Sequence, residues 1–176
     1  TSCNPNACGA PNPELISAAT RIAPLMKNGA TFLLSIGGQN DSGPFIDLTM
    51  TDVQATIYAQ NLKSYITQIN NNITSGVKIT GVDLDIEAWN SGGVITPLTK
   101  ALKEQGLIVA IAPILASVKN TPSMLSSNPA TLSLTGGGMA YSDYSGALAN
   151  GYVDYLLIQA YNGGSAGVIA IDSKAP

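Results

Sequence analysis

The chain has 176 residues, of which 45% are hydrophobic and 11% are charged, and its formal net charge is −3. This length is enough for one sizeable core and short for two, so we expect a single domain spanning residues 1–176. The weakly acidic balance argues against nucleic acid and anionic membranes as partners, and the lack of any histidine excludes Ser-His-Asp catalysis and the usual zinc ligand sets.

The N-terminal segment carries both cysteines of the chain, Cys3 and Cys8, in a stretch rich in proline, asparagine and glycine. They could form a small-loop disulfide or remain two free thiols. Because no further cysteine or histidine could complete a metal site, the sequence favours the disulfide. Frequent Asn, Ser, Thr and Gly with few charges are typical of secreted proteins, so we expect an extracellular protein.

Helices and strands are predicted to alternate along the chain. The first helix covers 14–27 and bends at its proline, and the first strand is the apolar run 30–38. A helix over 51–71 has apolar residues at helical spacing, namely Val53, Ile57, Leu62, Tyr65, Ile66 and Ile69. The later elements are a strand over 77–89, a helix over 95–105, a strand over 107–113, a loop over 115–140, a helix over 142–149 and a strand over 153–162.

The four predicted strands are interpreted as apolar on both faces, which is typical of a parallel sheet covered by helices. The order and length fit either a doubly wound sheet or part of a barrel, and periodicity does not choose between them. No apolar run approaches the roughly 20 residues of a membrane span, so we expect no membrane partner.

Three carboxylates occupy alternate positions of the strand that reads GVDLDIEAWN: Asp83, Asp85 and Glu87. On a strand they share one face. In an open sheet that face would lie under a helix, where unpaired carboxylates are costly. Inside a barrel they would line the axis toward the C-terminal mouth, where barrel enzymes carry out their chemistry. The pattern therefore favours a closed barrel with a functional acidic strand.

Acid catalysis is the favoured interpretation of this strand. Neighbouring carboxylates resist joint ionisation, so Asp83 and Asp85 could share a proton while Glu87 serves as a general acid. A divalent metal site is the main alternative, because Asp-x-Asp patterns bind Mg²⁺ or Ca²⁺ in many folds, and a structural role is the third. The absence of a phosphate-binding glycine loop argues against the metal site.

Four segments in this order resemble the family 18 glycoside hydrolases, the chitinases and their relatives: SIGG at 35–38, GVDLDIE at 81–87, AIAP at 110–113 and QAYN at 159–162. The opening CNPNACG is also similar to a cysteine-bearing loop in the compact members. The resemblance implies a (β/α)8 TIM barrel, of which this chain would cover the third to sixth strands. We therefore expect missing barrel segments, or a second half-barrel, to complete the fold.

The resemblance also implies an endo-acting chitinase that cleaves β-1,4-N-acetylglucosamine linkages with retention, the sugar's own acetamido carbonyl acting as nucleophile. Glu87 would be the general acid and base, Asp85 would orient the acetamido group, Asp83 would share its charge, and the Tyr161 hydroxyl would hold the same group. Residues implied to contact the sugar are Gly37, Gly38, Gln39, Trp89, Ala112, Pro113, Gln159 and Asn162. No cofactor or metal ion is implied. Thr80 stands where the family usually has an aspartate.

Two related functions remain as alternatives. An endo-β-N-acetylglucosaminidase acting on N-glycans or related polymers would use the same residues. A chitinase-like protein that binds sugar without cleaving it usually lacks the acid, so the presence of Glu87 favours catalysis. Chitin or N-acetylglucosamine oligosaccharides are accordingly the expected partners.

Overall fold

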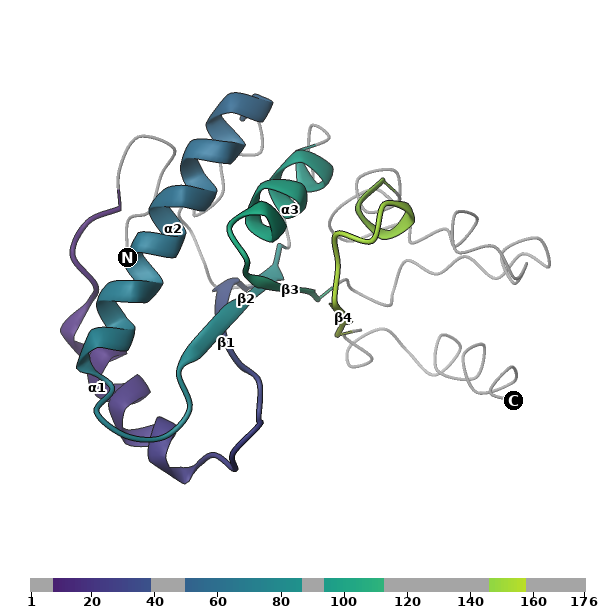
Figure 1. Ribbon diagram of the computed structural model, residues 1–176. Helices are drawn as coiled ribbons and strands as arrows, with labels where there is room; N and C mark the ends of the chain where they lie inside the picture. Colours follow the sequence, from purple (N-terminus) through teal and green to yellow (C-terminus); the bar gives the residue numbers. More distant parts are fainter. Residues whose placement is uncertain (1–7, 39–49, 87–93, 113–145, 158–176) are drawn as a thin grey trace, which may run out of the picture.

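The computed structural model describes residues 8–38, 50–86, 94–112 and 146–157. Within these ranges helices and strands alternate along the chain, and the strands form a parallel sheet (Figure 1). The elements are α1 (Pro13–Ile22), a 3-10 turn η1 (Ala23–Leu25), β1 (Phe32–Gly37), α2 (Asp52–Asn72), β2 (Ile79–Asp85), α3 (Ile95–Glu104), β3 (Ile108–Ile111) and β4 (Tyr155–Leu156). The predicted α/β class and the parallel strands are confirmed.

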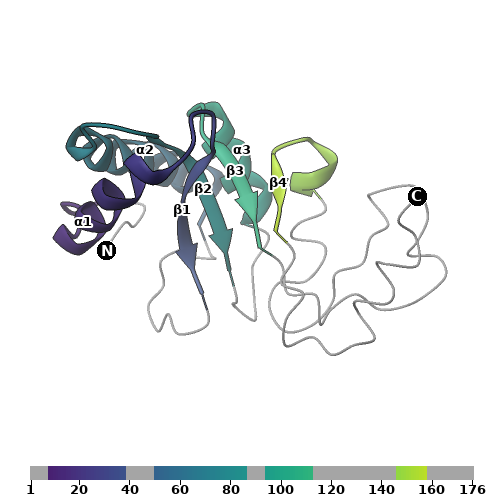
Figure 2. The ribbon, with the colours of Figure 1, turned by 90° about the horizontal axis from the view of Figure 1, so that it is seen from below.

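The four strands lie in the order β1-β2-β3-β4, and every neighbouring pair is parallel. The order is visible in Figure 2, where β4 lies at one edge of the sheet. The connecting helices α2 and α3 pack against each other on the same side of the sheet (Figure 1). Each crossover therefore moves the chain one strand further in the same direction.

The core lies between this sheet and its helices. On β2, Val82 and Leu84 are fully buried, whereas the alternating Asp83 and Asp85 are half-buried on the opposite face. The largest fully buried side chains are Tyr58, Leu62, Ile66, Ile69, Ile73, Leu84, Ile95, Leu98, Leu102, Leu107 and Ile111. The sheet thus has one apolar face against the helices and one face that carries the acids.

Helix α2 is positioned by polar contacts at both ends. At its start the Thr51 hydroxyl accepts from the Gln54 amide at 3.3 Å, and the Gln54 side chain accepts from the Thr51 amide at 2.9 Å, forming a capping box. At its end the Asn70 side-chain amide bonds both backbone groups of Ile79, at 2.8 and 2.9 Å. The end of α2 is therefore tied directly to the start of β2.

Two details of the predicted helices differ from the structure. The first helix ends at Ile22 and continues as the 3-10 turn η1, because Pro24 cannot donate the next helical hydrogen bond. In α2 the buried stripe passes through Ala55, Tyr58 and Ala59, as well as the predicted positions from Leu62 onward. Val53 and Ile57 are 68% and 39% exposed. The apolar spacing therefore predicts the wrong buried face for the first two turns of α2.

The remaining predictions are tested in part. Residues 146–149 are helical, as predicted for 142–149, while the predicted loop over 115–140 lies outside the described residues. Among the described residues no helix combines the length and apolar character that crossing a membrane requires. Cys8 is half-buried against the core and is not a free thiol. Its predicted partner Cys3 lies outside the described residues, so their pairing stays a prediction.

Candidate functional site

The sheet register brings the acids of β2 beside defined residues of the other strands. Asp83 lies opposite Ser35 of β1 and Ala110 of β3, and Ala110 in turn lies opposite Tyr155 of β4. These four residues form one row across the sheet, called the Asp83 row below. Register partners in a sheet point to the same face, so the Asp83 row lies on the face opposite the helices.

The Asp83 carboxylate is held at one oxygen only. Its Oδ2 accepts a hydrogen bond from the Ser35 hydroxyl at 2.9 Å. Its Oδ1 is buried and has no hydrogen-bond partner among the described residues. A buried acceptor without a donor is costly, so it calls for an explanation. Asp83 is therefore oriented by β1 through Oδ2, and its Oδ1 has no donor in the part of the chain that the structure describes.

Asp85, the next residue on this face, lies beside small residues. Gly37 is its register partner on β1, and the Gly38 amide donates to the Asp85 carbonyl oxygen at 2.8 Å. On the other side the Ala112 amide donates to the Leu84 carbonyl oxygen at 3.1 Å. A Cβ atom on Gly38 would lie 3.7 Å from the Asp85 Oδ2. Among the described residues, the neighbours of Asp85 on the β1 side are therefore two glycines.

A bulge at Thr80 determines which residues of β2 face the helices. Phe32 lies opposite Ile79 but Leu33 lies opposite Gly81, so Thr80 is an extra residue on β2. Without the bulge, Ile79 would share a face with Asp83; with it, Ile79 is buried at 4% exposure. Thr80 itself is exposed, with its hydroxyl 3.5 Å from the Phe32 carbonyl oxygen.

The acid-bearing face is concave. Strands β1 and β4 are three strand spacings apart, which in a flat sheet is about 14 Å. The Thr31 hydroxyl, immediately before β1, nevertheless lies 3.5 Å from the hydroxyl of Tyr155 on β4. A sheet that twists and curves toward the face that carries these two side chains brings them together. Because Tyr155 belongs to the Asp83 row, this is the acid-bearing face.

The structure brings together five of the predicted site residues at the ends of three adjacent strands: Gly37, Gly38, Asp83, Asp85 and Ala112. The other predicted residues, Cys3, Gln39, Glu87, Trp89, Pro113, Gln159, Tyr161 and Asn162, lie outside the described residues. Sequence reasoning missed Ser35 as a partner of Asp83. The serine belongs to the SIGG segment, but its role depends on the strand register and hence on the bulge at Thr80.

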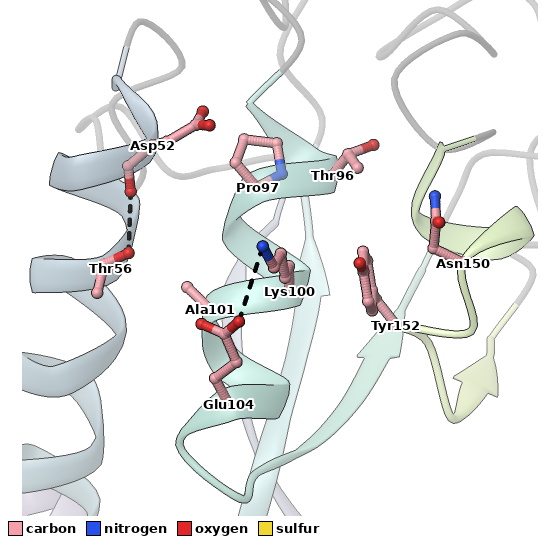
Figure 3. Close-up of a pocket in the computed structure, with 9 residues that line it drawn as sticks. All are labelled: Asp52, Thr56, Thr96, Pro97, Lys100, Ala101, Glu104, Asn150 and Tyr152. Carbon is pink, nitrogen blue, oxygen red and sulfur yellow. Dashed lines mark hydrogen bonds and ion pairs between the residues drawn. The ribbon is translucent and has the colours of Figure 1, made fainter.

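A cavity of about 230 Å³ lies on the helical side of the sheet (Figure 3). It is lined by Asp52, Thr56, Thr96, Pro97, Lys100, Ala101, Glu104, Asn150 and Tyr152. Lys100 and Glu104 form an exposed ion pair of 3.8 Å along its edge. Since α2 and α3 cover the face opposite the acids, this cavity is separate from the Asp83 row. Among the described residues no group of three His, Cys, Asp or Glu could hold a metal ion.

Comparison of the chain with protein-family models, with curated proteins and with solved structures found no match.

Proposed function

We propose that the chain carries the catalytic strand of an endo-acting chitinase, which hydrolyses β-1,4 linkages between N-acetylglucosamine units with retention of configuration. The supporting observation is the pair Asp83 and Asp85, half-buried on one concave face, with Asp83 oriented by Ser35 and Asp85 beside two glycines. Carboxylates fixed in advance in such a place can stabilise the positive charge that develops on a bound sugar.

In this proposal the substrate supplies the nucleophile, its acetamido carbonyl attacking the anomeric carbon. Asp85 accepts a hydrogen bond from the acetamido N–H and stabilises the resulting cation. Asp83 is the partner that shares the negative charge of Asp85. Glu87 protonates the departing glycosidic oxygen and then accepts a proton from the attacking water. Tyr161 holds the acetamido group. No cofactor is required.

We also propose that the sheet belongs to a (β/α)8 barrel, completed by further segments or by a second half-barrel. Three features support this: the strand order does not reverse, α2 and α3 lie on one side of the sheet, and the acid-bearing face is concave. A doubly wound sheet reverses its order at a switch point and carries helices on both faces. The described strands and crossovers do neither.

The test of the function is Glu87→Gln, assayed with a soluble chitooligosaccharide. Loss of the general acid should lower turnover by about 100-fold or more, while calorimetric binding of the same sugar is retained. Glu104→Gln on α3, where the side chain is 56% exposed, is the matched control and should leave turnover unchanged. Undiminished hydrolysis by the Glu87 variant would contradict the proposal. An N-glycan assayed in parallel separates the endo-β-N-acetylglucosaminidase alternative.

A further inference from the structure

Strand β4 is joined to β3 by only a short stretch of backbone pairing in the described part of the chain. Two residues pair with β3, and the flanking bonds run from the Asp154 amide to the Val109 carbonyl and from the Leu157 amide to the Ile111 carbonyl, both at 2.8 Å. Tyr155, Leu156 and Leu157 are 45%, 37% and 46% exposed. A strand with exposed side chains on both faces has a weakly specified register, because packing does not penalise a slip.

The Asp154 side chain specifies the register of β4. Its carboxylate accepts from the Lys103 ammonium at 2.7 and 2.8 Å, and its Oδ2 also accepts from the Val109 amide at 2.8 Å. One carboxylate thus joins α3, β3 and β4. These bonds lower the pKa of Asp154: partial burial alone would raise it, but the hydrogen bonds from Lys103 and Val109 and the Lys103 charge together outweigh burial.

A slip of β4 by one residue would break this arrangement. The carboxylate would leave the Val109 amide, and that amide would lose its acceptor. The slip would also turn every side chain of β4 to the other face. Tyr155 would leave the Asp83 row and Leu156 would replace it, while Leu157 would move away from the acid-bearing side.

We infer that Asp154 is a positioning residue: its bonds to Lys103 and Val109 fix the register of β4 and so place Tyr155 and Leu157 on the face that carries Asp83 and Asp85. The register itself follows from the contacts above. Its catalytic consequence rests on the proposed function, because strand β4 leads into the segment that carries Gln159 and Tyr161.

The experiment is NMR on the labelled full chain, in which register is read without any activity. The native chain should show a nuclear Overhauser effect between the Tyr155 ring and the Thr31 methyl, and slow exchange of the Leu157 amide. In Asp154→Asn and Lys103→Met we expect the Overhauser effect to be lost and the exchange to be about tenfold faster. Lys103→Arg, which keeps a cationic donor, should restore both.

Two controls make the result specific. Lys100→Met removes the other lysine–carboxylate pair of α3 and should change neither signal. The Gly38 amide, bonded to Asp85 on the far side of β2, should keep its protection in every variant. Retention of the Tyr155 contact and of Leu157 protection in both Asp154→Asn and Lys103→Met would overturn the inference. Loss of Gly38 protection as well would mean general unfolding and would equally overturn a local role.

Activity then tests the catalytic consequence. For a soluble chitooligosaccharide, kcat/KM should fall about tenfold or more in Asp154→Asn and Lys103→Met, and stay at the native value in Lys103→Arg and Lys100→Met. A native chain without hydrolysis would count against the proposed function of this chain by itself, whereas the NMR result would still decide the register. Native kcat/KM in a variant whose register has slipped would overturn the positioning role.

Discussion

The two carboxylate oxygens of Asp83 have different surroundings. One oxygen accepts from the Ser35 hydroxyl at 2.9 Å, and the other is buried without a partner among the described residues. The Ser35 hydroxyl therefore restrains the orientation of the carboxylate through Oδ2 alone.

Gly37 is the position at which the site least tolerates a side chain. Its φ is 108°, and a Cβ atom there would lie 2.0 Å from the Asp85 carbonyl oxygen. Gly37→Ala should therefore lower the free energy of unfolding by about 3 kcal/mol or more, because β1 and β2 must separate in addition to the backbone strain. The measurement is urea-induced unfolding followed by circular dichroism.

Gly29→Ala separates the two contributions to this loss. Gly29 also has a positive φ, 86°, but a Cβ atom there would meet nothing within 4 Å. That variant should lose only about 1–2 kcal/mol, the cost of the left-handed backbone alone. Equal losses at the two positions would mean that contact with Asp85 is unimportant and that Gly37 is needed only for its backbone conformation.

Among the elements, those with a strong local signal were predicted well. The helix over 51–71 is α2 at Asp52–Asn72, because its apolar residues recur at helical spacing. The helix over 95–105 is α3 at Ile95–Glu104, because Gly106 follows its last turn. The bulge at Thr80 could not be predicted, since it exists only in the pairing of β1 with β2. The exposure of Val53 and Ile57 likewise depends on which neighbours cover the start of α2.

The contact between α3 and β4 should make stability depend on pH. The pKa of Asp154 is lowered in the folded chain, so its ionised form stabilises the fold above the ordinary pKa of 3.8. This contribution, at most about 1 kcal/mol because 33% of the side chain is exposed, should disappear as the pH falls through the lowered pKa. Urea unfolding of the native chain and of Asp154→Asn between pH 2 and 7 measures the difference.

The two stability curves should run apart at neutral pH and converge below about pH 4. Lys103→Met provides a second comparison, because it removes the cation and leaves the carboxylate with the Val109 amide. A difference between native chain and Asp154→Asn that stays constant down to pH 2 would show that the charge of Asp154 contributes nothing and that only its shape matters.

For the molecule as a whole, the sequence predicted that Asp83 and Asp85 share one face of the sheet, but not which contacts hold them. Alternation on one strand suffices to place Asp83 and Asp85 on a common face. The bond from Ser35 to Asp83 spans 48 residues, and the one from Lys103 to Asp154 spans 51. Such contacts depend on strand order and register, which local periodicity does not encode. The concave curvature of the sheet depends on the same long-range packing.

The outer edge of β4 should make the chain self-associate. Among the described strands β4 lies at the edge of the sheet, and Tyr155, Leu156 and the adjacent Leu157 are exposed there. Edge strands readily pair with another chain. We expect light scattering coupled to size-exclusion chromatography to show a mass above that of the monomer, rising with concentration over about 1–100 μM. Leu157→Lys should shift the protein to monomer, because a charge on an edge strand opposes pairing.

Leu25→Lys is the matched control, since Leu25 is 83% exposed in η1, away from the sheet edge, and its substitution should leave association unchanged.

The form of the association also bears on completion of the barrel. If β4 of each copy pairs with β1 of the other, both edges are used and a discrete dimer results. Pairing at one edge only would leave free edges and give a broad series of larger species. A discrete dimer that Leu157→Lys dissociates would therefore support completion of the barrel by a second half-barrel. A native chain that stays monomeric throughout the concentration series would contradict the prediction, because β4 would then offer no edge for pairing.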